Sequence, residues 1–289
     1  MRLPILLLAA LPLAGQVFTF TKEQMIEYTA KNPYGRFEDG RPMIPDDVIE
    51  KAKGLSVEEI WSILPGEKFG YQYEGGFQIL HPGTKLLGRA VTAQFMPIRP
   101  DVTAVSEKGK PDVPAHQRVI DTLREGDVLV ADLFGKIDGG TITGDNLAAA
   151  VWSATKRGMV VDGGIRDLEG IYPMPIQVYF RGAHPSAIRD VMLTGYNIPV
   201  RIGQATVVPG DLVFGDRTGV YFVPPHLLQK ILDRAEVTHI HDEWTKDKFM
   251  TGKYKSSDLY GSPRIPALKK EYEEYLEKKL GRKPASKKQ

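Results

Sequence analysis

Two short polar motifs lie one helix length apart in the sequence. The first is Gly144-Asp145-Asn146-Leu147, and the second is Arg166-Asp167, with twenty residues between Asp145 and Arg166. Carboxylates are hard oxygen ligands, and Mg²⁺ commonly takes one or two of them while keeping several waters. A guanidinium group can hold a carboxylate or an enolate oxygen through two parallel hydrogen bonds. The pattern therefore predicts a site that holds a divalent metal beside a small oxyanion.

Each motif also has a purely structural explanation. Asp145 could serve only as the cap of a helix, and Arg166-Asp167 could form only a surface turn. The amides of Asn146 and Leu147 would then be ordinary helix-start amides, although such amides with the helix dipole also form an anion site. What favours a functional site is that the two motifs flank one predicted βαβ unit.

The elements around the motifs build that unit. Residues 128–133 form a buried apolar run that predicts a strand, residues 146–156 predict a helix, and residues 159–162 predict the next strand. A crossover of this kind is right-handed and joins two parallel strands. Because ligands in open α/β sheets bind beyond the carboxyl ends of the strands, both motifs are expected at one edge of the sheet.

These motifs resemble the RraA-like family. The resemblance rests on Gly144-Asp145-Asn146-Leu147, the Asp-x20-Arg-Asp spacing, residues 160–167, and residues 208–216 with Gly219-Val220. It covers roughly residues 88–224. The family contains class II pyruvate aldolases that act on 4-hydroxy-4-methyl-2-oxoglutarate and the regulator of ribonuclease activity A. The resemblance implies an α/β/α sandwich with a mixed β core, assembled as trimers or hexamers with sites between subunits.

The resemblance also implies a role for each motif residue. Asp167 would bind the divalent metal, Mg²⁺ or Mn²⁺, and Arg166 would hold the pyruvyl part of the substrate. Asp145 would hold a metal-bound water. An acid from the C-terminal helix of a neighbouring subunit completes the family site, and Glu243 is the candidate here. The carboxylate of the substrate would be received by the amides of Gly144, Asp145, Asn146 and Leu147.

The reaction that these roles imply is retro-aldol cleavage of a 4-hydroxy-2-oxo acid to pyruvate. Decarboxylation of oxaloacetate passes through the same enolate, which a metal and an arginine both stabilise. The alternative is a non-catalytic RraA-like regulatory binding protein. The intact Arg166-Asp167 pair favours the enzyme. The chain departs from a minimal family member by its length at both ends and by the loop at residues 135–143.

The N-terminus has the layout of a secretory signal peptide. Arg2 precedes an apolar run at residues 3–13, and Ala14-Gly15 follows it. We therefore expect a signal peptide at residues 1–15 and an exported protein, periplasmic or secreted. The alternatives are a buried N-terminal helix, which Pro4 and Pro12 disfavour, and a cytoplasmic protein. The run is too short for a membrane span, and no other segment is apolar enough for one.

The rest of the chain divides into three parts. Residues 16–82 predict a helical N-terminal extension, residues 83–250 an RraA-like α/β catalytic domain, and residues 251–289 a C-terminal helix and basic tail. The formal net charge of +2 lacks the basic excess of a nucleic-acid-binding protein. The absence of cysteine excludes disulfides, thiolate catalysis and cysteine-ligated metals. The expected partner is a small-molecule oxo acid.

Overall fold

The structure is a computed structural model that describes residues 17–282. The expected signal peptide at residues 1–15 and the basic end of the tail lie outside the described residues. Within residues 17–282, no helix combines the length and the apolar character that crossing a membrane requires.

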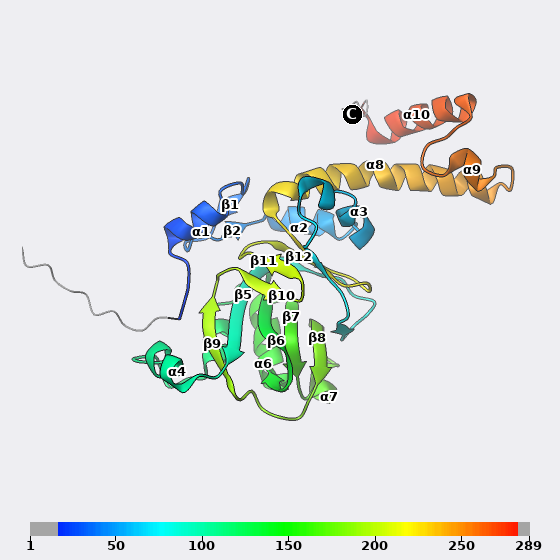
Figure 1. Cartoon of the computed structure of the whole chain (residues 1–289). Coiled ribbons are helices and arrows are strands. Elements are labelled where there is room, and N and C mark those ends of the chain that lie inside the picture. Colours follow the sequence, from blue (N-terminus) through cyan, green and yellow to red (C-terminus); the bar gives the residue numbers. More distant parts are fainter. Residues whose placement is uncertain (1–16, 283–289) are drawn as a thin grey trace, which may run out of the picture.

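A nine-stranded mixed sheet forms the centre of the molecule (Figure 1). Its strand order is β3-β13-β12-β5-β6-β7-β8-β4, with β9 paired to β5. Strands β5 to β8 run parallel to one another, and the remaining pairings are antiparallel. The strands of this sheet are β3 (Tyr73–Glu74), β4 (Gln78–Ile79), β5 (Leu86–Pro97), β6 (Asp127–Thr141), β7 (Gly158–Ile165), β8 (Gln177–Ala183), β9 (Val191–Tyr196), β12 (Leu212–Gly215) and β13 (Val220–Val223).

Two small antiparallel pairs and a set of helices surround the sheet. The pairs are β1 (Gly35–Arg36) with β2 (Pro42–Met43), and β10 (Val200–Ile202) with β11 (Ala205–Val207). The helices are α1 (Lys22–Tyr28), α2 (Asp46–Ala52), α3 (Val57–Trp61), the 3₁₀ turn η1 (Pro65–Glu67), α4 (Pro100–Ser106), α5 (Ala115–Ile120), α6 (Asp145–Thr155), α7 (Leu168–Ile171), α8 (Pro225–Met250), α9 (Ser256–Leu259) and α10 (Pro266–Leu280).

The predicted βαβ unit is present. Strands β6 and β7 pair in parallel from Val128 opposite Gly158 to Asp132 opposite Asp162, and α6 connects them. Residues 127–133 of β6 and all of β7 are buried, which explains why their sequences are mainly apolar. Helix α6 ends at Thr155, and its C-cap residue Lys156 adopts a left-handed conformation.

The two faces of the sheet are covered differently. Alternate residues such as Leu129 and Val161 face one core with α5 and α6, whereas Val128 and Val160 face a second core with β10 and β11. A third core joins β12 and β13 to α2, α3 and α8. The structure is thus mixed α/β with a large mixed sheet, flanking helices and a helical C-terminus, as the sequence predicted.

The expected loop at residues 135–143 is wrong in its first part. Strand β6 continues to Thr141. After a first register shift Lys136 pairs with Gly163, and after a second shift Thr141 pairs with Gly164. Glycine permits this path, because a Cβ at Gly140 would lie 1.9 Å from the Lys136 carbonyl oxygen. This stretch of β6, residues 133–141, is called the β6 excursion. It pairs with the carboxyl end of β7, next to the predicted site.

The N-terminal extension is only partly helical. Thr21 and Ser56 begin α1 and α3 with capping boxes, and Glu59 completes the box at Ser56. However, β3 and β4 lie within residues 16–82 and extend the sheet at its two ends. At the other terminus, α8 and α10 pack through a small cluster around Trp244 and form an arm that projects from the body (Figure 1).

Candidate functional site

Two backbone hydrogen bonds bring the predicted motifs together at the carboxyl end of β7. The Ile142 amide donates to the Gly164 carbonyl at 3.2 Å, and the Arg166 amide donates to the Thr143 carbonyl at 3.0 Å. The segment that leads into α6 therefore lies alongside the segment that leaves β7. The prediction that both motifs share one sheet edge is confirmed.

Gly144 is the point of closest approach between the motifs. A Cβ built there would lie 2.2 Å from Asp167 Oδ2 and 3.2 Å from Arg166 Nε. Arg166 Nε and Asp167 Oδ2 are 3.5 Å apart, and their side chains are 41% and 42% exposed. Asp167 adopts φ 58° and ψ 41°, a left-handed conformation uncommon outside glycine that often marks functional positions. The Arg166 guanidinium and the Asp167 carboxylate thus lie next to the start of α6.

Asp145 does not cap α6, so its purely structural explanation as the helix cap is wrong. Gly144 is the N-cap residue, and Asp145 is the first residue of the helix. The Asp145 carboxylate accepts the Asn146 amide at 2.7 Å and packs against Gly170 of α7, where a Cβ would lie 2.8 Å away. The first bond of the helix ladder runs from the Ala148 amide to the Gly144 carbonyl, so the preceding amides belong to the helix end.

A cavity of about 920 Å³ opens beside this helix start. Four of the expected site residues line it, namely Gly144, Asn146, Leu147 and Arg166. Asp145 and Asp167 are not among the lining residues, although the Asp167 carboxylate lies next to Gly144. The opposite wall comes from residues 107–117 and 187–193. The cavity is large enough for a small oxo acid, which would meet Arg166 and the α6 amides at one corner.

The sequence did not reveal the contacts that the β6 excursion makes near the cavity. Asp138 Oδ1 accepts a bond from Arg189 Nη2 at 2.7 Å, and Ser186 Oγ accepts the Gly139 amide at 2.8 Å. The bond with Arg189 lowers the pKa of Asp138. Arg189 also lines the cavity, and its guanidinium group pairs with Asp138 and Asp190. The glycines at 135, 139 and 140 were the only signal of an unusual backbone path here.

The residues present fit a weakly coordinated divalent metal. Among residues 17–282, no three His, Cys, Asp or Glu side chains cluster in a metal-binding arrangement. Asp167, however, presents one half-exposed carboxylate beside Gly144, and Asp145 presents another at the start of α6. This donor set matches Mg²⁺, which uses one or two protein carboxylates and retains waters. Asp167 would hold such an ion.

Glu243 does not reach this cavity within one chain. It lies on α8, where its carboxylate binds Lys279 Nζ at 2.8 Å, and this bond lowers its pKa. Helix α8 crosses the end of the sheet opposite α7 (Figure 1). A contribution from Glu243 of a neighbouring subunit therefore stays a prediction.

A family sequence model described as RraA-like, Aldolase/RraA, matches residues 62–222. The chain belongs to the RraA-like family. In RraAS2 of Streptomyces coelicolor, described as an unusual member of the RNase ES inhibitor RraA protein family, the fold recurs with a TM-score of 0.61 and 27% identity. That similarity covers 75% of this chain and all of RraAS2.

Two curated relatives extend the comparison. Protein DlpA of Legionella pneumophila is 28% identical over 183 residues, which is 62% of this chain and 28% of DlpA. The 4-hydroxy-4-methyl-2-oxoglutarate aldolase of Thermus thermophilus is 27% identical over 108 residues, 37% of this chain and 65% of the aldolase. The chain therefore spans less than two thirds of either relative.

Proposed function

We propose that this RraA-like protein is a divalent-metal-dependent lyase. Its substrate would be a 4-hydroxy-2-oxo acid of the 4-hydroxy-4-methyl-2-oxoglutarate type, cleaved to pyruvate, with oxaloacetate decarboxylation as a second reaction. The observation that carries the proposal is the meeting of Arg166, Asp167 and the α6 helix start around Gly144, at the corner of one cavity. The name of the Thermus thermophilus relative supports the same reaction.

Each residue has a definite task in this reaction. The α6 amides bind the carboxylate of the substrate, and Arg166 donates hydrogen bonds to the pyruvyl oxygen on which negative charge develops. A divalent metal held by Asp167 would supply Lewis-acid stabilisation of the same charge. The bond between C3 and C4 breaks, its electron pair forms the pyruvate enolate, and the C4 hydroxyl loses its proton as the carbonyl product forms. Asp145 is our candidate for positioning the water that takes this proton, and a proton returned to C3 of the enolate completes pyruvate.

The proposal includes assembly as a trimer or hexamer. Helix α8 carries Glu243 away from the cavity of its own chain, so an acid from that helix could act only in a neighbouring copy. The solution mass of the protein tests the assembly. Mixing Glu243→Gln subunits with Arg166→Ala subunits tests whether two copies share an active site. A mixed assembly would contain some sites with Arg166 from one copy and Glu243 from its neighbour, both intact, and should regain part of the activity. Export by residues 1–15 is a further proposal, tested by cell fractionation.

A non-catalytic regulator is the second candidate. The description of RraAS2 as a member of an RNase inhibitor family favours it. The two candidates predict different results in one experiment, which measures pyruvate release from a panel of 4-hydroxy-2-oxo acids and oxaloacetate with Mg²⁺, with Mn²⁺ and with EDTA. Wild-type protein should release pyruvate only with metal. Inactivity on the whole panel, combined with capture of a stoichiometric protein partner, would favour the regulator.

A pair of variants makes this experiment specific. Asp167→Ala should abolish pyruvate release, whereas Asp101→Ala, which removes an exposed acid on α4, should leave it unchanged. An Asp167→Ala protein as active as wild type would sink the proposed site even if the protein proved to be a lyase.

A further inference from the structure

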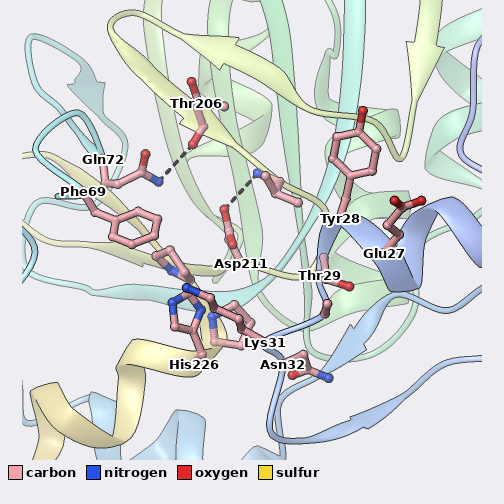
Figure 2. Close-up of a pocket in the computed structure, with 14 residues that line it drawn as sticks. Glu27, Tyr28, Thr29, Lys31, Asn32, Phe69, Gln72, Thr206, Asp211 and His226 are labelled. Atoms are coloured by element: carbon pink, nitrogen blue, oxygen red, sulfur yellow. Dashed lines mark hydrogen bonds between the residues drawn. The ribbon is translucent and has the colours of Figure 1, made fainter. Parts of the chain in front are cut away.

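A second cavity, of about 490 Å³, lies where the N-terminal extension meets the sheet (Figure 2). Four separate stretches form it: residues 27–32 at the end of α1, residues 69–72 before β3, residues 206–211 between β11 and β12, and residues 224–226 at the start of α8. The first and last stretches lie outside the family match at residues 62–222. No described residue lines both this cavity and the one beside Arg166.

The walls of this cavity are mainly apolar, and its polar side chains are largely committed. Phe69 meets the His226 ring edge-on, with 5.7 Å between the ring centroids. Burial lowers the pKa of His226, so the imidazole is neutral near pH 7. The Gln72 amide group donates to the Thr206 and Phe222 carbonyls at 3.0 and 2.9 Å. A volume in this range, apolar walls and few polar groups are typical of small-molecule sites.

Asp211 is the exception among these side chains. It is only 4% exposed, and its Oδ2 accepts the Val208 amide at 2.9 Å. Figure 2 shows its carboxyl group in the middle of the lining residues, between Phe69 and Tyr28. Within residues 17–282, no Lys, Arg or His side chain pairs with it, and burial raises its pKa to about 7. Asp211 is thus a buried acid without a paired cation, although Lys31 also lines the cavity.

We propose that this cavity binds a small molecule that carries a protonated amine on an apolar body, with the ammonium group bonded to Asp211. An ammonium group brings the missing positive charge and donors for the remaining lone pairs of the carboxylate, and such charge-assisted bonds are about twice as strong as neutral ones. The apolar walls cover the body of the ligand. A ligand carboxylate would face Asp211 and be repelled. The other titratable side chains that line the cavity are Glu27, Tyr28, Lys31 and His226.

Calorimetric titration with three matched probes tests this site. The probes are 2-phenylethylamine, the neutral 2-phenylethanol and the anionic phenylacetate. At pH 8 the amine should bind saturably and at least about tenfold more tightly than the alcohol, and phenylacetate should not bind. Between pH 8 and pH 6 the affinity for the amine should fall about tenfold, since the ionised fraction of Asp211 falls from about 90% to about 10% around its pKa of about 7. Absence of saturable amine binding, or equal binding of amine and alcohol, would overturn the proposal.

Variants assign the binding to this cavity. Asp211→Asn keeps an acceptor for the Val208 amide, yet it should weaken amine binding at least about tenfold and remove its pH dependence, while pyruvate release stays unchanged. Ala30→Trp fills the cavity from an exposed position of its rim and should also abolish binding, which keeps the test decisive if Asp211→Asn fails to fold. Ala267→Trp, on the exposed face of α10, is the matched control. Amine binding that survives either cavity variant would refute the assignment.

Discussion

The two cavities of this protein place their charges in opposite ways. Beside α6, Arg166 and Asp167 are 41% and 42% exposed and lie 3.5 Å apart at the solvent edge. Beside α1, Asp211 is 4% exposed, among apolar walls. Half-exposed charges can exchange water for a ligand at little desolvation cost. A buried acid, in contrast, binds favourably only a ligand that supplies the opposite charge. The first cavity therefore suits a hydrophilic oxo acid and a metal, and the second suits an apolar amine.

The cavities also differ in what holds them together. At the first cavity, backbone hydrogen bonds within one βαβ unit hold the two motifs together, such as the bond from the Arg166 amide to the Thr143 carbonyl. The second needs the N-terminal extension to stay on the sheet. A buried ion pair contributes to that attachment, because Arg41 binds both Asp127 oxygens, at 2.8 and 3.0 Å. Loss of the attachment should open the second cavity before the first.

The largest effect is expected from Asp127→Ala. This change leaves the Arg41 guanidinium, which is 2% exposed, without its acid partner, and breaking one side of a buried pair costs about 3–5 kcal/mol. Urea denaturation should show that loss in the free energy of unfolding, and phenylethylamine binding should weaken more than pyruvate release. The control is Asp47→Ala, which breaks an exposed pair with Lys51 and should cost less than about 1 kcal/mol. Equal losses of unfolding free energy in Asp127→Ala and Asp47→Ala would contradict a role of the Arg41–Asp127 pair in holding the N-terminal extension on the sheet.

Arg166→Ala should separate the two cavities by function. Removing a donor that stabilises developing charge lowers kcat by about 10²–10³-fold, and we expect this loss in pyruvate release. Amine binding should not change, because Arg166 does not line the second cavity. Arg99→Ala, on an exposed arginine paired with Asp101, is the matched control and should retain wild-type kcat. A kcat for Arg166→Ala within about threefold of wild type would argue against an enolate mechanism.

The first cavity was predictable because its determinants are local. Residues 128–133 and 159–162 have mainly apolar sequences that predict buried strands. Because a helix that connects two parallel strands crosses over in one hand, Asp145, Arg166 and Asp167 are then expected at one edge of the sheet. What local rules could not supply was the orientation of Asp145. Its carboxylate turns to the Asn146 amide and to Gly170, a contact that depends on how α7 packs after Asp167.

The second cavity was not predictable because its walls are distant in sequence. Asp211 follows Pro209-Gly210 and reads as a turn residue, and the structure does give it a turn-like bond to the Val208 amide. Nothing in the spacing indicates that residues 27–32 pack over it. The same limit explains the β6 excursion, whose pairing of Thr141 with Gly164 depends on three-dimensional contact and not on strand propensity.

Gly144→Ala should produce a moderate effect that is confined to the first cavity. The backbone at φ −110° accepts alanine, but the new Cβ would lie 2.2 Å from Asp167 Oδ2 and displace that carboxylate. Displacement of a positioned group by about 1 Å can cost up to about 10²-fold, and we expect a roughly 10- to 100-fold loss in kcat/KM. Gly66→Ala has open space around its Cβ and is the control. A Gly144→Ala enzyme with the metal dependence and kcat/KM of wild type would show that Asp167 acts elsewhere.

The last effect is a pH dependence of stability that belongs to Asp211. Burial raises its pKa in the folded protein to about 7, from its ordinary value of 3.8. Between about pH 4 and pH 7 the folded state keeps a proton that the unfolded state has released, so this residue makes the protein less stable as the pH rises through that window. The slope is at most about 1.4 kcal/mol per pH unit.

Urea denaturation of wild type and Asp211→Asn from pH 4.5 to pH 8 measures this slope. The variant lacks the titrating group, so its free energy of unfolding should rise relative to that of wild type up to about pH 7 and then stay level. Saturating phenylethylamine should stabilise wild type more at pH 8 than at pH 6, because the amine binds the ionised form of Asp211. A difference between the two proteins that does not change with pH would mean that Asp211 is already ionised in the empty cavity, and the amine would then bind without taking up or releasing a proton.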